Sequence, residues 1–236
     1  MKKIFIVFFS LLLVSVHCFA AEFIILPSIG YSNLSYGMRS WSFSVGSMQQ
    51  AYGDSTFSLN SMDVGISLGF ITKSSGFTFI ANNDFSVIGK GSTILDGSDS
   101  HGNSLTKIFD IKNPFAWEMS IVLGRTFKLY DDKFYINVGA GPAVGMKVFS
   151  IYMENAGKKE KLKDVGINSG VRIQLGTQYF FSEKIGISLI LADTLAIAYS
   201  ESADGYVRAI NDYLKLAYKT GFENIFNIKT GVMFRF

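Results

Sequence analysis

Bulky apolar residues alternate with small or polar residues along most of the chain. In residues 115–123, for example, Trp117, Met119 and Ile121 occupy odd positions, whereas Glu118 and Ser120 lie between them. Successive side chains of a β-strand point to opposite faces, so this alternation predicts strands that each have one apolar face. The sequence therefore predicts an all-β fold.

Eight segments show this pattern or fill the gaps between those that do. Three are less regular: residues 23–36, 77–88 and 185–199. The second puts Asn83 on its apolar face and the third puts Asp193 there, so each is predicted to contain a β-bulge or a register shift. The segments with clean alternation are residues 64–70, 115–123, 134–147, 167–179 and 226–236.

The connections between these segments alternate between long and short. Outer-membrane barrels have short turns on one side and longer loops on the other. The sequence therefore predicts an antiparallel up-and-down β-barrel of about eight strands, which spans the membrane and forms one domain over residues 21–236. The predicted long surface loops are residues 37–61, 89–114, 153–164 and 201–224, and the predicted short turns are residues 72–76, 131–133 and 182–184.

Composition indicates which face of the barrel meets lipid. Hydrophobic residues make up 48% of the chain and charged residues only 17%, against about 25% charged residues in ordinary soluble domains. A soluble lipocalin-type barrel would need its bulky residues inside and charged residues outside. We therefore expect the bulky face to meet lipid and the small or polar face to line the lumen. The net charge is only +3 and its basic residues are scattered, so nucleic acid is not an expected partner.

The first 20 residues have the parts of a secretory signal peptide. Lys2 and Lys3 precede an apolar run over residues 4–16, and Ala20 ends a segment suited to cleavage. Acylation of Cys18 and an uncleaved anchor are less favoured, because His17 precedes the cysteine and the run is shorter than the roughly 20 residues of a spanning helix. We expect residues 1–20 to be removed during export to the outer membrane of a diderm bacterium.

The chain ends on aromatic residues that are in phase with the apolar face. Phe234 and Phe236 resemble the C-terminal signal by which the barrel-assembly machinery recognises outer-membrane proteins. The chain after residue 20 resembles the small eight-stranded outer-membrane proteins, the group that contains the OmpA transmembrane domain, OmpX and OmpW. The resemblance implies a monomer with outer-membrane lipid and the assembly machinery as partners. Likeness to OmpW implies a channel or carrier for small or hydrophobic solutes.

Charged residues of both signs occur on the predicted inner face. They either pair and close the lumen, because an unpaired buried charge is costly, or they set the selectivity of a small-solute pore. The first alternative implies a structural or surface-interaction role. The candidate lumenal residues are Asp63, Asp84, Glu118, Lys147, Arg172 and Lys229, with Lys128 and Arg235 on the same face.

Catalysis, cofactor binding and metal binding are not predicted. The chain after residue 20 has one histidine, His101, and its neighbours Ser98, Asp99 and Ser100 are too close in sequence to hold the geometry of a nucleophile and its base. A basic cluster in the loop predicted over residues 153–164 is either a solvated loop tip or a contact for anionic lipid head groups or a polyanion. This cluster comprises Lys158, Lys159, Lys161 and Lys163.

Overall fold

The structure is a computed structural model that describes residues 21–45, 48–99, 101–155, 158–201, 214–218 and 221–236. The predicted signal peptide, with Cys18, lies outside the described residues. No helix long and apolar enough to cross a membrane occurs in the described part of the chain. The strands are β1 (Ala21–Val45), β2 (Met48–Thr72), β3 (Phe77–Asp99), β4 (Ser104–Leu129), β5 (Phe134–Asn155), β6 (Lys158–Phe180), β7 (Ile185–Glu201), β8 (Leu214–Tyr218) and β9 (Gly221–Arg235).

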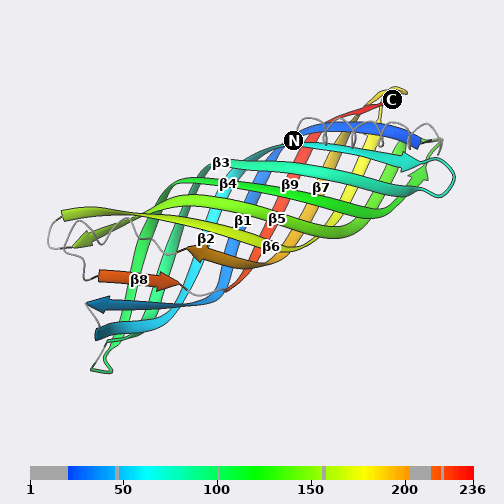
Figure 1. Ribbon diagram of the computed structural model, residues 1–236. Helices are drawn as coiled ribbons and strands as arrows, with labels where there is room; N and C mark the ends of the chain where they lie inside the picture. The colour runs from blue at the N-terminus through cyan, green and yellow to red at the C-terminus, as the bar shows by residue number, and fades with distance from the viewer. Residues whose placement is uncertain (1–20, 46–47, 100, 156–157, 202–213, 219–220) are drawn as a thin grey trace, which may run out of the picture.

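Eight of these strands form a closed antiparallel barrel. Each of β1 to β7 pairs with the next described strand of the barrel, and β9 pairs with both β7 and β1, which closes it (Figure 1). The short β8 adds to the far end of β1 and is not part of the wall. The predicted eight-stranded up-and-down barrel is confirmed.

The barrel strands are strongly staggered. Following paired residues once around the wall from Asn33 returns to β1 at Phe23, ten residues away. Such a stagger requires strands tilted by roughly 35–45° from the barrel axis, and eight strands leave an interior just wide enough for side chains. Whether the lumen is filled or open therefore depends on the size of the side chains that face inward.

The two ends of the barrel differ. At one end, the turn end, short turns join β2 to β3, β4 to β5 and β6 to β7. At the other, the hairpin end, the strands continue well past the barrel (Figure 1). There β4 pairs with β5 only as far as Asp110, and β6 pairs with β7 only as far as Val165. Only the tip of the β5–β6 hairpin, beyond Tyr152, is thus not paired with β4.

This arrangement corrects the prediction of long loops. Most of residues 37–61, 89–114 and 153–164 belong to strands, and β8 and the start of β9 lie within 201–224. The alternation is weak there because a hairpin outside the membrane has water on both faces and needs no apolar side. Residues 202–213 lie outside the described part of the chain.

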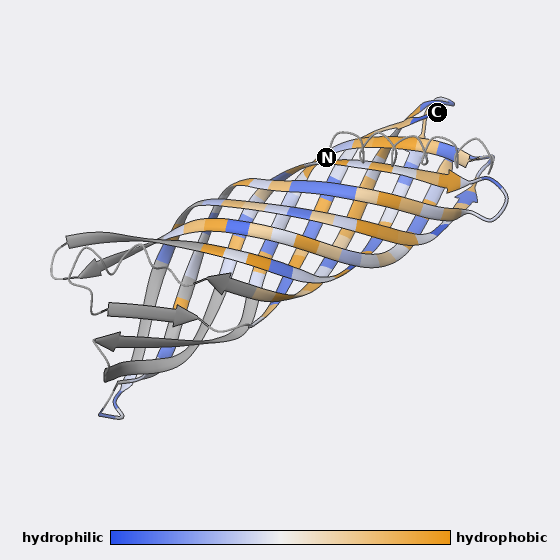
Figure 2. Cartoon of the chain, in the orientation of Figure 1, coloured by the Kyte–Doolittle hydropathy of each residue, from blue (hydrophilic) through white to orange (hydrophobic). Residues whose placement is uncertain are grey.

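The outer wall is apolar, as expected of a barrel that spans lipid. Apolar stretches alternate with polar ones along the barrel strands in Figure 2, and the exposed large side chains include Val138, Ile173 and Leu189. Aromatic side chains recur where the strands begin or end at the turn end, the position of an aromatic belt at a membrane interface. They are Phe23, Phe70, Phe77, Phe127, Phe134, Tyr179 and Phe234.

Of the two predicted irregularities, one is confirmed. Segment 77–88 contains a register shift against β2, beside Val87 and not at Asn83, whereas the described pairing of β7 is continuous through Asp193. Each polar group has a neighbouring partner: Trp117 Nε1 donates to Asn83 Oδ1 at 2.5 Å, and Asn224 Nδ2 donates to Asp193 Oδ1 at 2.6 Å. Because these bonds satisfy the side chains in place, the strands keep their register.

Candidate functional site: the barrel lumen

The charged residues predicted for the inner face come together in the lumen. They are supplied by six different strands and lie at buried inward positions, whereas their sequence neighbours face outward. Their exposed fractions are Asp63 1%, Asp84 5%, Glu118 8%, Lys147 2%, Arg172 1% and Lys229 2%.

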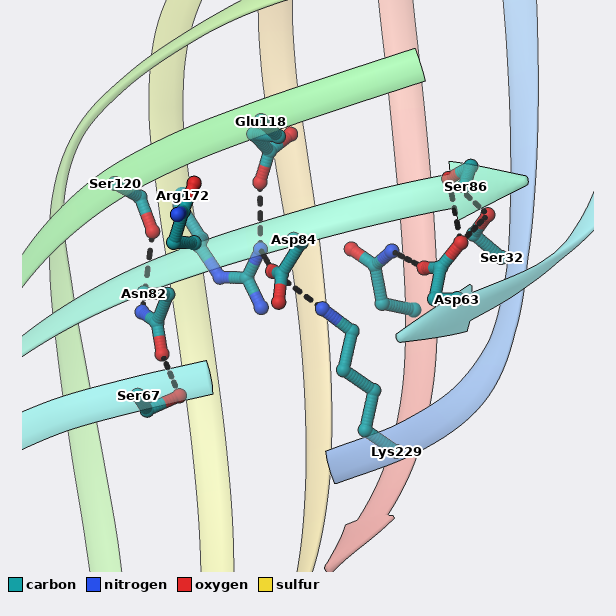
Figure 3. Close-up of polar contacts among 12 residues, drawn as sticks. Ser32, Asp63, Ser67, Asn82, Asp84, Ser86, Glu118, Ser120, Arg172 and Lys229 are labelled. Carbon is teal, nitrogen blue, oxygen red and sulfur yellow. Dashed lines mark hydrogen bonds and ion pairs between the residues drawn. The ribbon is translucent and has the colours of Figure 1, made fainter. Parts of the chain in front are cut away.

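A mid-lumen cluster of Asp84, Glu118, Arg172 and Lys229 crosses the barrel (Figure 3). Arg172 Nη1 lies 2.5 Å from Glu118 Oε1 and 3.1 Å from Asp84 Oδ2. Lys229 Nζ forms an ion pair with the same oxygen of Asp84. Two acids and two bases thus compensate one another where water is scarce, which is the condition under which buried ions are tolerated.

Asp63 is satisfied differently. Its Oδ1 accepts hydrogen bonds from Ser32 Oγ at 2.8 Å and Ser86 Oγ at 2.5 Å, and its Oδ2 accepts one from Asn227 Nδ2 at 2.9 Å. Figure 3 shows Ser32 and Ser86 at the Asp63 carboxylate, beside the mid-lumen cluster. Hydrogen bonds to an ionised acceptor are stronger than those between neutral groups. The bonds to the Asp63 carboxylate therefore link β2 with β1, β3 and β9.

A second ion pair lies nearer the hairpin end. Lys147 Nζ is 2.5 Å from Glu223 Oε2, and Asn168 Nδ2 donates to Glu223 Oε1 at 3.0 Å. Glu223 was not among the predicted lumenal residues, because it was assigned to the last long loop. Extending the alternation backwards from Phe226 would have found it, since Phe222 also faces outward.

A third cluster closes the lumen at the turn end. Glu22 accepts hydrogen bonds from Lys128 Nζ at 2.6 Å and from the Tyr135 hydroxyl at 3.1 Å. The Arg235 guanidinium lies over the Phe180 ring, 4.2 Å from its centroid, which is cation–π geometry. Lys128 and Arg235 were predicted to face inward, whereas Glu22 was not identified.

An apolar layer separates this third cluster from the mid-lumen cluster. Its side chains face inward and are almost fully buried, and they contact Tyr135 and Phe180 of the third cluster. The prediction that the inner face is small or polar is therefore wrong at these positions, whereas Thr78, Thr126 and Asn137 near the turn end are inward and polar. The apolar layer consists of Ile24, Leu26, Ile71, Ile80, Val122, Ile190, Ala192 and Met233.

A small cavity lies in the described lumen. A cavity of about 20 Å³ lies between the mid-lumen cluster and the Lys147–Glu223 pair, and Ser32, Leu34 and Leu59 are among its lining residues. Such a volume holds roughly one water molecule. The inward Gly139 does not leave open space, because a Cβ there would lie 2.7 Å from Val122 Cγ1.

The inward charges of the described residues balance in number. The arrangement can therefore stabilise a filled barrel without net charge, and it contains polar layers at both ends of an apolar one. The acids are Glu22, Asp63, Asp84, Glu118 and Glu223, and the bases are Lys128, Lys147, Arg172, Lys229 and Arg235.

The other predicted residues lie outside the lumen. Lys158, Lys159, Lys161 and Lys163 belong to the first residues of β6, at the hairpin end of the barrel; their side chains are outside the described part. Phe236 is 67% exposed, and its backbone exchanges hydrogen bonds of 3.1 and 2.9 Å with Phe23. Phe234 pairs with Ile25 and with Ile185. His101 lies in the exposed turn between β3 and β4.

Comparison with protein families matches nearly the whole chain to one family. The model of a family described as "Domain of unknown function (DUF2715)" matches residues 19–236. The chain belongs to the DUF2715 family. No curated protein matches its sequence. The closed barrel and its apolar wall give this DUF2715 chain the architecture of an outer-membrane protein.

Similar solved structures include outer-membrane barrels of several bacteria. Ail, the attachment invasion locus protein of Yersinia pestis, has 12% identity and a TM-score of 0.35, with 92% of this chain and 99% of that chain covered. Neisserial surface protein A has 9% identity and a TM-score of 0.39, covering 91% and 97%. The outer-membrane protease OmpT of Escherichia coli has 9% identity and a TM-score of 0.41, also covering 91% and 97%.

Proposed function

We propose that this protein is a non-enzymatic, monomeric surface-interaction protein, in which a barrel with a closed lumen holds β-hairpins outside the outer membrane. The observation that carries this proposal is the lumen, which is filled by balanced ion pairs and an apolar layer. Ions crossing it would have to break buried pairs and then pass apolar side chains without water, and both steps are costly. The hairpins are then the surfaces left to interact.

Conductance of the refolded protein, residues 21–236, in a planar bilayer tests the closed lumen. We expect no discrete current steps from the wild type, nor from Glu118→Gln, because the apolar layer lies outside the cluster that this substitution changes. The fraction that is folded and inserted is measured by its heat-dependent electrophoretic mobility, so a silent bilayer is not mistaken for failed insertion. Steps whose ion selectivity differs between the two proteins would reject the closed lumen.

A second candidate is a channel or carrier for small or hydrophobic solutes, as the likeness to OmpW implies. The cavity beside the mid-lumen cluster favours it, because Leu34, Leu59 and Ile225 contribute apolar lining. Its volume of about 20 Å³ is far below the several hundred Å³ of ordinary ligand pockets. The closed scaffold therefore agrees better with the described lumen.

The β5–β6 hairpin supplies a place for interaction with anionic molecules. Four lysines occur within residues 158–163 at the start of β6, and such a cluster of positive charge attracts polyanions. Replacing all four lysines by glutamine is expected to weaken binding of dextran sulfate to the detergent-solubilised protein about tenfold at low salt. Fluorescence anisotropy of labelled dextran sulfate measures this change.

The matched control removes exposed lysines from the turn end instead. Lys73, Lys133 and Lys184 lie in the short turns and are exposed. Their replacement by glutamine should leave binding within about twofold of wild type, because their charges lie further from the hairpin than the Debye length of about 10 Å at 0.1 M salt. Equal losses in both variants would show that net charge, not the hairpin, attracts the polyanion.

A further inference from the structure

Polar side chains interrupt the apolar outer wall where the barrel closes. We call Tyr31, Asn33, Asn60, Asp193 and Asn224 the polar wall patch; they lie on β1, β2, β7 and β9. Asn60 Oδ1 accepts hydrogen bonds from Tyr31 at 2.5 Å and from Asn33 at 2.6 Å, and Asn224 donates to Asp193 at 2.6 Å. Polar groups on a lipid-facing surface are costly, so a patch of five polar side chains requires an explanation.

An exposed aromatic ring lies in the middle of the patch. Phe226 is 38% exposed and pairs with Asp193 on one side and with Asn33 on the other. The ring is therefore flanked by a carboxylate on β7 and an amide on β1, all on the outward face of the wall. A flat ring bordered by hydrogen-bonding groups is suited to a ligand that has both apolar and hydroxyl-rich sides.

The patch lies at the height of lipid head groups. A tilted barrel strand crosses the hydrocarbon layer in about 9–11 residues. Counted from Phe23 in the aromatic belt of the turn end, this length places Asn33 at the opposite boundary of the layer, and its row partner Asp193 at a similar level. The patch therefore faces the head groups of the outer leaflet.

The membrane boundary alone does not explain the patch, because the opposite wall is apolar at a comparable level. Val144 of β5 lies ten residues after Phe134, as Asn33 lies ten residues after Phe23, and Val144 is 45% exposed. Its neighbours on the same wall, Met146 and Val171, are 38% and 52% exposed. Asn83 on β3 and Ser169, which pairs with Val144, are polar positions elsewhere on the outer wall, but the polar side chains that hydrogen-bond one another in the patch lie around the β9–β1 seam.

We propose that the polar wall patch binds the sugar head group of an uncharged glycolipid of the outer leaflet. Carboxylate and amide oxygens accept hydrogen bonds from sugar hydroxyls, amide nitrogens donate to them, and Phe226 packs on the apolar face of a sugar ring. The charged member of the patch is Asp193, and its carboxylate repels the phosphate of an anionic lipid. This proposal is independent of whether the lumen is closed.

Native mass spectrometry of lipids retained by the folded barrel tests the proposal. The refolded protein is equilibrated with equal amounts of digalactosyl diacylglycerol, phosphatidylglycerol and phosphatidylcholine, and bound lipids are counted after gentle removal of detergent. We expect wild type to retain the galactolipid at least about fivefold over phosphatidylglycerol. Equal retention of the three lipids, or a preference for phosphatidylglycerol, would overturn the proposal without any variant being needed.

Two variants then assign the preference to the patch. The triple variant Asn33→Leu, Asp193→Leu and Asn224→Leu should lose the preference yet fold, because leucine suits a lipid-facing wall. Val144→Leu on the opposite wall should keep it. If the triple variant retains the preference, the patch is not the site. If wild type is a dimer that the triple variant abolishes, a second copy covers the patch and the glycolipid proposal fails.

Discussion

Replacing Arg172 with methionine is expected to lower the free energy of unfolding by about 3–5 kcal/mol, the usual cost of removing one partner from a buried ion pair. Arg172 is 1% exposed, and its Nη1 contacts both Glu118 and Asp84. Methionine leaves Glu118 as a buried carboxylate that has lost its basic partner. Urea unfolding of the barrel in lipid vesicles, followed by tryptophan fluorescence, measures the change.

A second substitution separates the loss of charge compensation from the loss of packing. Glu118→Gln in the Arg172→Met background removes the uncompensated carboxylate, while Asp84 keeps its ion pair with Lys229. The double variant is therefore expected to recover more than half of the lost stability. A water-filled pore would give a different result, because solvent would screen the carboxylates and Arg172→Met alone would cost less than about 1 kcal/mol.

The barrel could be predicted because its wall separates two media, lipid outside and the lumen inside. This separation produces the alternation of apolar and polar residues along each strand. Lipid demands apolar residues on every second position, so segments such as 167–179 show the pattern in full, and their inward Arg172 could be placed from sequence alone. Its ion-pair partners could not be predicted from the sequence. Whether Arg172 meets Asp84 or another acid depends on the stagger between strands, which alternation does not encode.

Two acids were missed for different physical reasons. Glu223 lies where β9 begins beyond the predicted strand, so the pattern had too few residues to reveal it. Glu22 lies next to Ile24 and Leu26, whose inward side chains are apolar, so both faces of β1 look alike there. Where the inward side chains are apolar, the two faces of a strand no longer differ in hydrophobicity. Inward residues then cannot be identified from the alternation.

That dry layer is the feature with the greatest bearing on function, and Ile71 tests it. Its side chain is fully buried in the lumen in one cluster with Ile24 and Ile80, and its paired residues on the neighbouring strands are Glu22 and Thr78. Ile71→Asn is expected to cost about 3 kcal/mol, because the shorter polar side chain loses apolar contacts and leaves a cavity in a closed lumen. The same urea titration in vesicles measures the loss.

A matched substitution in a polar part of the lumen makes the test specific. Gln178 is also buried and inward but has a hydrogen-bonding side chain, so Gln178→Asn alters size by one methylene and is expected to cost about 1 kcal/mol. A closed lumen predicts a clear difference between the two variants together with silent bilayers for both. If Ile71→Asn is tolerated as well as Gln178→Asn and the barrel conducts, water reaches the layer, and the solute channel becomes the better account of this protein.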